Sequence, residues 1–220
     1  MNKNRAIDPI GRLMGLRYKS HPWHGVDIGS DVPNTLVCFI EVVPTDTVKY
    51  EIDKATGYLK IDRPQKYSNI IPALYGFIPQ THCGAQLAAL TNECLERNDI
   101  VGDNDPLDIC VLTEKEISHG NLLVKAKPIG GFRMLDRNEA DDKIIAVLLD
   151  DAVYGDYNDI SDIPPAVITR LKHYFLTYKD MPGEKRGCEI PVVYGKEEAH
   201  RVIQSTILDY KKHIDELLFG

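Results

Sequence analysis

The densest group of chemically active side chains is the acidic segment GDNDPLDICVL, residues 102–112. Asp103, Asp105 and Asp108 lie there directly before an apolar run that predicts a strand. Crowded carboxylates repel one another unless a cation lies between them. Because Pro106 and the following strand restrict the loop, the spacing favours a binding site for a hard cation over a solvated acidic turn.

An EF-hand calcium loop is one alternative for this segment. Counted from Asp103, Glu114 falls at the twelfth position, where that loop carries its bidentate glutamate. The sixth position is Asp108, although the loop requires glycine there for its sharp turn. The EF-hand geometry is therefore excluded, and a calcium-stabilised structural domain remains as a separate hypothesis.

The charge of the chain argues against two classes of partner. Its 220 residues include 26 Lys and Arg against 33 Asp and Glu, a net charge of −7. The negative charge is concentrated between Asp99 and Asp162, mostly as aspartate. Nucleic acids and anionic membranes attract cationic surfaces, so neither is a predicted partner. The longest apolar run, residues 144–149, is far shorter than the roughly 20 residues of a membrane-spanning helix, and no secretory signal is visible.

The elements that must position the acidic side chains are mostly short strands. Apolar and β-branched runs bounded by turn residues predict strands at residues 35–44, 48–53, 58–63, 107–112, 122–127, 131–135 and 143–149. Many short strands at this spacing indicate a small barrel. Two helices close the chain. Ser161 or Asp162 is expected to cap the first, ahead of Pro164, and the second is expected to run from about Lys196 to Leu218.

Residues 48–63 predict a hairpin, and its polar face is ambiguous when it is considered alone. Lys49 and Glu51 point the same way because side chains alternate along a strand. In isolation the pair indicates an exposed salt bridge of little energetic value. Beside the acidic loop, we expect both side chains to face the same site.

Other candidate sites are weaker. His21 and His24 in HPWHG have HxxH spacing, but Pro22 interrupts a helical face and no third ligand is evident. No phosphate-binding GxxxxGK[ST] loop and no GxGxxG occurs. The cysteines include no CxxC pair, which favours reduced thiols and a cytoplasmic location. They are Cys38, Cys83, Cys94, Cys110 and Cys188.

The segment DNDPLD followed by Ile109 resembles the signature of the soluble family I inorganic pyrophosphatases. Five further segments occur in that family's order: FIEVVP, VKYEIDKATGYLKIDR, IIPALYGFIP, DRNEADDK and HYFLTYKDM. The resemblance spans about residues 41–181. It implies an OB-like five-stranded barrel, mainly β with flanking helices (α+β), in which residues 1–34 are an N-terminal extension and residues 35–220 a single inorganic pyrophosphatase domain.

The resemblance also implies an activity and the residues that carry it. The activity is hydrolysis of pyrophosphate to two orthophosphates by several Mg²⁺ ions, with a metal-activated water and Asp105 as general base. Implied metal ligands are Asp103, Asp108, Asp136, Asp141 and Glu51. Implied phosphate-binding residues are Lys49, Arg63, Tyr75, Lys143, Tyr178 and Lys179. Glu41 is implied to be a carboxylate that lies next to the metal ligands and does not itself bind the metal.

The chemistry of pyrophosphate requires a set of this kind. Pyrophosphate carries up to four negative charges, and cations must neutralise its oxygens before a nucleophile can approach. Mg²⁺ is small and hard and takes carboxylate, phosphate and water oxygens. Lysine ammonium groups and a positioned carboxylate base complete the requirements.

Two positions and one segment depart from the family pattern. Ile71 replaces a tyrosine found in many relatives, which removes a hydroxyl expected near the site. Arg137 replaces an acid after Asp136, which is expected to weaken an outer metal position or add a cation. Residues 81–98 resemble an insertion that could form a short surface helix.

Assembly and one alternative function complete the expectations. Short prokaryotic members of the family form homohexamers, so we expect a homo-oligomer and favour a homohexamer. The alternative is a non-catalytic barrel that binds oligonucleotides. The acidic charge and the absence of aromatic residues interleaved with a basic stripe argue against it.

Overall fold

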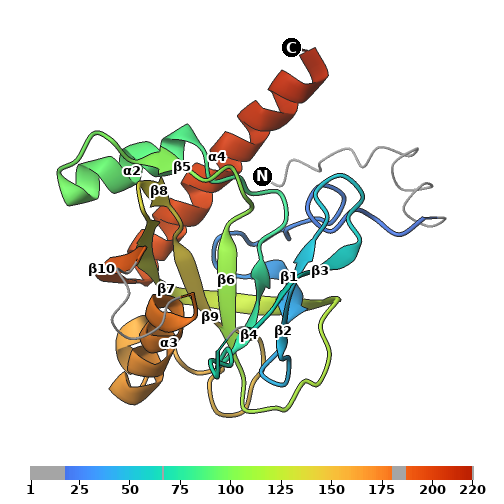
Figure 1. Cartoon of the computed structure of the whole chain (residues 1–220), viewed down its shortest axis with the longest axis vertical. Helices are drawn as coiled ribbons and strands as arrows, with labels where there is room; N and C mark the ends of the chain where they lie inside the picture. The colour runs from blue at the N-terminus through green and yellow to red at the C-terminus, as the bar shows by residue number, and fades with distance from the viewer. Residues whose placement is uncertain (1–17, 66, 180–186, 220) are drawn as a thin grey trace.

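The computed structural model describes residues 18–65, 67–179 and 187–219. Its main sheet contains a closed ring of five strands, because β1 pairs with both β4 and β7 and so joins the two ends of the ring (Figure 1). The ring consists, in order, of β1 (Leu36–Val42), β4 (Leu74–Phe77), β6 (Asp108–Leu112), β9 (Lys143–Leu148) and β7 (Leu122–Asp136). The prediction of a mainly β fold built on a five-stranded barrel with flanking helices is confirmed.

Among the described residues, five further strands extend or border this barrel. A separate hairpin is formed by β2 (Val48–Ile52) and β3 (Leu59–Pro64), as the sequence predicted. The strand β10 (Cys188–Gly195) pairs with β7, and β5 (Val101–Gly102) pairs in parallel with β8 (Glu139–Ala140). Neither β4 nor β10 was predicted, because Gly76 and Pro191 interrupt their apolar patterns. Gly76 is required there, since a Cβ would lie 1.9 Å from the Phe39 carbonyl oxygen.

One predicted boundary inside the sheet is wrong. Residues 122–127 and 131–135 are not two strands but parts of the single 15-residue strand β7. Pro128 and the adjacent glycines, which looked like a turn, instead form a register shift in the pairing with β9. The bulge lets one long strand bend around the barrel and pair with β1 at its start and β10 at its end.

In the part of the chain that the structure describes, three α-helices flank the barrel: α2 (Ala85–Leu95), α3 (Pro165–Thr177) and α4 (Lys196–Phe219). The second predicted helix agrees with α4 to within one residue. The predicted cap of α3 is wrong, because Asp159 caps the short 3₁₀-helix η1 (Ile160–Asp162) and α3 begins afterwards, at Pro165. Proline is favoured in this first position because the missing N–H has no helical partner.

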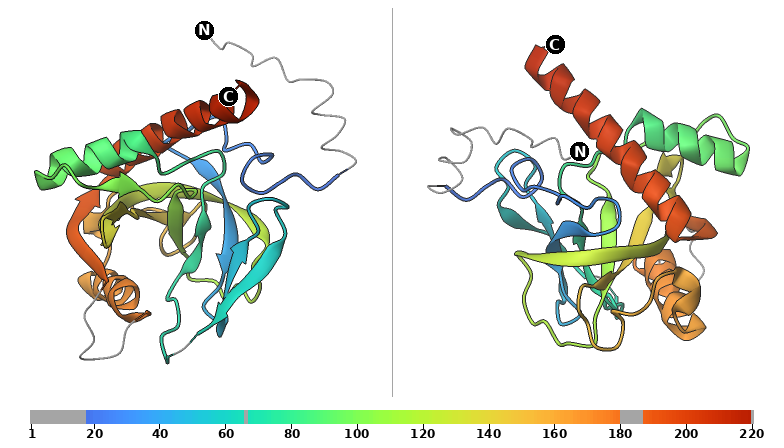
Figure 2. Two further views of the ribbon diagram at one scale, coloured as in Figure 1. Left: turned by 45° about the horizontal axis from the view of Figure 1, so that its top comes forward. Right: turned by 180° about the vertical axis from the view of Figure 1, so that it is seen from behind.

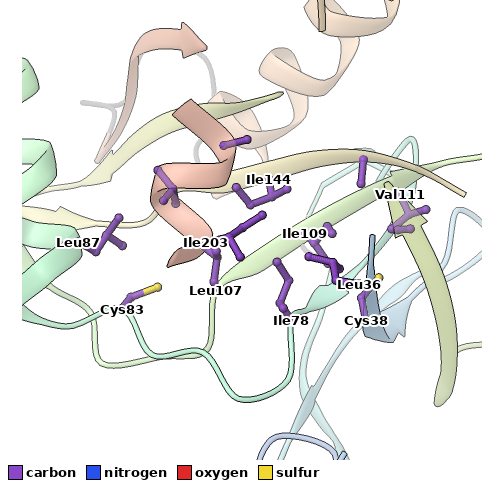
Figure 3. Close-up of a cluster of buried hydrophobic side chains, with 14 of the residues drawn as sticks. Leu36, Cys38, Ile78, Cys83, Leu87, Leu107, Ile109, Val111, Ile144 and Ile203 are labelled. Atoms are coloured by element: carbon purple, nitrogen blue, oxygen red, sulfur yellow. The ribbon is translucent and has the colours of Figure 1, made fainter. Parts of the chain in front are cut away.

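The central strands are buried on both faces. In β6, Ile109 and Val111 belong to a cluster that includes Ile203 of α4 (Figure 3). The alternate residues of β6, Cys110 and Leu112, belong to a second cluster that includes residues of α3. Helices α3 and α4 therefore cover different parts of the core, which is why β6 and β9 are almost continuously apolar.

The predicted insertion does form a helix, α2, and it packs beside α4 (Figure 2). Its N-terminus has no cap from its own segment. Asp209 of α4 supplies one, since its carboxylate accepts hydrogen bonds from the backbone N–H groups of Gly84, Gln86 and Leu87 at 2.9–3.2 Å. Among the residues that the structure describes, no helix is both long and apolar enough to cross a membrane.

We expect Asp209→Ala to lower the free energy of unfolding by about 1–2 kcal/mol, because it leaves several N–H groups of α2 without an acceptor. Urea unfolding monitored by circular dichroism measures the change. Asp215→Ala is the matched control, since Asp215 is exposed on the same helix and should alter stability by less than about 0.5 kcal/mol. Equal effects of the two substitutions would contradict the capping role.

Candidate active site

The directions of three strands bring distant carboxylates to one end of the barrel. The strands β6 and β9 are parallel, and Asp108 and Lys143 at their first positions are paired in register. The strand β7 runs antiparallel to β9, so its last residue, Asp136, lies at the same end. Asp141 lies two residues before the start of β9. The acidic side chains are thus gathered by strand topology, not by closeness in sequence.

The loop before β6 is fixed by its backbone. The N–H of Cys83 donates to the Asp105 carbonyl at 2.8 Å, and the N–H of Asn104 donates to the Cys83 carbonyl at 3.0 Å. The Asp105 N–H also donates to a carboxylate oxygen of Asp103 at 2.9 Å. A Cβ on Gly102 would lie 2.1 Å from the Cys83 carbonyl oxygen, so the loop can pack this closely only with glycine there.

A cavity of about 220 Å³ opens between this loop, the β2–β3 hairpin and the residues that follow α3. Its polar lining includes Glu41, Lys49, Glu51, Lys54, Tyr75, Asp103, Asp105, Asp108, Asp136, Glu139, Asp141, Lys143, Tyr178 and Lys179. Every residue that the resemblance assigned to the site is among them except Arg63. The Arg63 guanidinium lies 5.7 Å from the centre of the Tyr178 ring, beside the cavity lining.

Lys143 is the centre of the most buried charge cluster in this cavity. Its side chain is 2% exposed, and its ammonium contacts Asp108 at 2.5 Å and also contacts Asp141. The Tyr75 hydroxyl donates to the same Asp108 oxygen at 2.5 Å. Burial opposes the charge of Lys143, but the two carboxylates outweigh it and hold its pKa well above the usual value. Lys143 therefore remains a cation among the acids.

The pKa values of Asp103 and Glu41 are displaced upward. Burial, assisted by the charge of Asp141, raises the pKa of Asp103 to about 8. Burial also raises the pKa of Glu41 to about 8. Glu41 accepts a hydrogen bond from the Ile52 N–H at 2.7 Å and so connects the barrel to the hairpin. Lys143 lowers the pKa of Asp103, but burial and the charge of Asp141 outweigh it, which leaves the Asp103 charge poorly compensated.

Lys49 and Lys179 also pair with carboxylates of the cavity. The Lys49 ammonium lies 3.2 Å from Glu51 and 3.2 Å from Asp62. Lys179 lies 2.6 Å from Asp136. Burial opposes both charges, yet the neighbouring acidic groups raise the pKa of Lys49 and of Lys179. The hairpin pair is thus part of a half-buried charge network and not an exposed salt bridge.

The donors in this cavity suit a hard divalent cation, because they are carboxylate oxygens that repel one another. Within the described part of the chain, no group of three or more acidic, histidine or cysteine side chains is arranged to hold a metal ion as it stands. Lysine ammonium groups lie between the acids instead, Lys143 between Asp108 and Asp141. The carboxylates of the site suit a metal ion when these lysines form hydrogen bonds with another partner and no longer with the acids.

Sequence reasoning missed two polar residues of the lining, Lys54 and Glu139. Both lie inside segments that resemble the family, but the resemblance assigned neither a role, and no local pattern distinguishes them from surface charges. The two departures from the family pattern do not line the cavity: Ile71 is buried in the core beside α3, and Arg137 is exposed. Arg137 is therefore not among the cations that line the cavity, and its effect on the outer metal position stays a prediction.

The histidines of HPWHG lie in an aromatic cluster. The His21 and His24 rings are 4.7 Å apart, and Trp23 stacks on His24 at 4.5 Å. His24 also hydrogen-bonds the Tyr210 hydroxyl at 3.0 Å, and burial lowers its pKa to about 4. The five cysteines, all within the described residues, are free thiols.

Sequence comparisons identify relatives over most of the chain. A family model described as inorganic pyrophosphatase matches residues 38–211. The inorganic pyrophosphatase of Chlamydia caviae is 53% identical over 195 residues, which cover 86% of this chain and 90% of that protein. Soluble inorganic pyrophosphatase 2 of Chlamydomonas reinhardtii is 38% identical and covers 88% of this chain and 90% of that protein.

Structural comparisons agree with the sequence matches. The crystal structure of the inorganic pyrophosphatase from Thermus thermophilus has a TM-score of 0.72 and 26% identity, and covers 87% of this chain and 99% of that chain. The type I inorganic pyrophosphatase from P. falciparum has a TM-score of 0.73 and 28% identity, and covers 88% of this chain and 64% of that chain. Together with the closed ring of strands, these likenesses confirm the OB-like barrel.

The raised pKa of Asp103 makes a prediction about the metal-free protein. In the unfolded chain this carboxyl titrates near pH 4, whereas in the folded chain it titrates near pH 8. Between these two pH values the folded state binds a proton that the unfolded state does not. The free energy of unfolding therefore falls as the pH rises from about 4 to about 8. Asp103→Asn should stabilise the protein at pH 8.5, and much less at pH 4.

Urea unfolding in EDTA at both pH values measures this difference. Asp156→Asn is the control, because Asp156 is exposed and is not part of the cavity lining. A loss of stability in Asp103→Asn at pH 8.5 would contradict the proposed electrostatic strain at this position.

Proposed function

Because the chain belongs to the inorganic pyrophosphatase family and is thus an inorganic diphosphatase, we propose that it cleaves pyrophosphate in this cavity, with Mg²⁺ as cofactor and Asp105 as general base. The observation that supports the proposal is the meeting of carboxylates and lysines from five separate segments around one small cavity. A solvated acidic turn would not need cationic partners from the hairpin, from β9 and from the end of α3.

In this proposal the carboxylates hold the metal ions and the cations hold the phosphates. Bound Mg²⁺ neutralises phosphate oxygens and lowers the pKa of water. The residues that would hold it are Asp103, Asp108, Asp136, Asp141 and Glu51. Glu41 supports them by fixing β2 through the Ile52 N–H.

The lysines exchange partners when substrate binds. Lys143 leaves Asp108 and Asp141 and donates hydrogen bonds to phosphate oxygens, and Lys49 and Lys179 do the same from their own acids. Charge-assisted hydrogen bonds to a polyanion replace the ion pairs, so no lysine is left buried and unpaired. Tyr75, Tyr178 and Arg63 add hydroxyl and guanidinium donors at the border of the same space.

Asp105 acts on the nucleophile. It accepts a proton from a water molecule, the water oxygen attacks one phosphorus atom, and the bond from that phosphorus to the bridging oxygen breaks. The second phosphate leaves with the bridging oxygen and its electron pair. Asp105 suits this task because it lies in the rigid loop between Asp103 and Asp108 and is half-exposed to the cavity.

The remaining features of the proposal concern the whole chain. Residues 35–220 form one catalytic domain after the extension of residues 1–34, and the protein acts in the cytoplasm, which agrees with its unpaired thiols. It assembles as a homo-oligomer, with a homohexamer favoured. Exposed apolar side chains such as Val193 of β10 and Leu208 of α4 support an assembly, and light scattering after size exclusion measures its mass.

Phosphate release from pyrophosphate should require Mg²⁺. The expected result is rapid release with Mg²⁺, none with EDTA, and inhibition when Ca²⁺ is added, because Ca²⁺ is larger and binds with a different coordination geometry. A colorimetric phosphate assay measures all three. Full activity in EDTA would contradict a metal-dependent mechanism.

Asp105→Asn should lower kcat about 10²- to 10⁴-fold, the usual contribution of a general base, while the fold is retained. Steady-state kinetics measure kcat, and circular dichroism checks the fold. Asp156→Asn should hydrolyse pyrophosphate at the parent rate. If Asp105→Asn also matched the parent rate, Asp105 would not be the base.

A further inference from the structure

Lys54 is a cation of the cavity to which the resemblance gives no role. It lies in the turn between β2 and β3, and its ammonium forms an ion pair with the Asp105 carboxylate from the other side of the cavity. The two side chains are 46% and 43% exposed, so the pair lies at the mouth of the cavity and not in its interior. It joins the hairpin turn to the residue proposed as the base.

The turn that carries Lys54 is fixed by residues from the N-terminal extension. The His21 Nδ1 accepts hydrogen bonds from the N–H groups of Trp23 and His24, at 3.2 and 3.4 Å. The proton of the neutral ring must therefore lie on Nε2, which donates to the Lys54 carbonyl oxygen at 3.2 Å. The imidazole thus holds the backbone of the lysine itself.

Close packing reinforces this hydrogen bond. Gly57 in the same turn has φ +72°, and a Cβ there would lie 2.8 Å from the His21 ring and 2.8 Å from Pro22. Trp23 is 4% exposed, and its indole N–H donates to the Thr81 carbonyl oxygen at 2.7 Å. The segment from His21 to Trp23 is therefore anchored in the body of the protein and pressed against the hairpin turn.

The ion pair with Asp105 indicates that the Lys54 ammonium must move away from this carboxylate during the reaction. Asp105 can accept a proton from water only if its oxygens face that water, so a lysine held on the carboxylate obstructs it. Pyrophosphate carries more negative charge than a carboxylate and, in the proposed function, binds in the same cavity. It offers the ammonium a stronger charge-assisted hydrogen bond than Asp105 does.

We propose that Lys54 is a further pyrophosphate-binding residue, whose ammonium leaves Asp105 for a phosphate oxygen; this inference rests on the proposed function. His21 is the positioning residue that holds the Lys54 turn in place. The N-terminal extension, which the sequence left without a role, then contributes to substrate binding although it does not touch the substrate.

Substitution of Lys54 tests the first part. Lys54→Met should raise the KM for magnesium pyrophosphate roughly 10- to 100-fold, the range for loss of a hydrogen bond to a charged group, with kcat changed less than about threefold. Lys54→Arg should recover most of the affinity. Lys60→Met is the matched control, because Lys60 lies on the same hairpin but pairs with Asp53 at 3.9 Å and does not line the cavity.

Two outcomes would overturn this part. If Lys54→Met lowered kcat with KM unchanged, Lys54 would only hold Asp105 in place. If it behaved like Lys60→Met, the ion pair would be a surface contact without function. A parent protein that releases no phosphate from pyrophosphate would instead contradict the proposed function, so the two failures are distinguishable.

A double-mutant cycle tests the role of His21. His21→Ala should raise KM about 3- to 10-fold in the parent protein, in line with the loss of one hydrogen bond, and should have no further effect in the Lys54→Met background. His119→Ala, an exposed histidine elsewhere, should leave KM at the parent value. Equal effects of His21→Ala in both backgrounds would overturn the positioning role, and Trp23 fluorescence with circular dichroism verifies that each variant is folded.

Discussion

Mutual repulsion among carboxylates at one end of the barrel is the constraint on which the rest of the site depends. Asp103, Asp108 and Asp141 face a cavity of about 220 Å³, and such a group cannot stay ionised without cations between its members. The chain supplies lysines for this purpose, and Lys143 is the most deeply buried of them. At Asp103, burial and the charge of Asp141 outweigh the effect of Lys143 and raise the pKa to about 8.

The topology explains why the charges can be brought together without destroying the fold. The parallel pairing of β6 and β9 places Asp108 beside Lys143 at the first position of each strand. The buried apolar residues of both strands follow directly after this charged pair. The residues that follow, such as Ile109 and Ile144, are fully buried and hold the strand ends rigidly. A well-packed core thus supports a polar site at its end, and the two depend on different residues of the same strands.

The parts of this arrangement that depend on local patterns could be predicted from the sequence. The hairpin and α4 follow from their periodicity, β6 and β9 follow from their apolar runs, and the acidic loop follows from its composition. The bulge in β7 was mistaken for a turn because Pro128 and its neighbouring glycines have the same local preference in both structures. The roles of Lys54 and His21 could not be predicted, because they arise from contacts between segments more than 30 residues apart, which no local pattern records.

The most direct test of the account is a crystal structure with Mg²⁺ and a non-hydrolysable diphosphate analogue. We expect ions bound between Asp103, Asp108 and Asp141, and the Lys143 ammonium moved from Asp108 and Asp141 to an oxygen of the analogue. This expectation would be contradicted if no ion lay between these carboxylates at saturating Mg²⁺ and Lys143 still contacted Asp108 and Asp141.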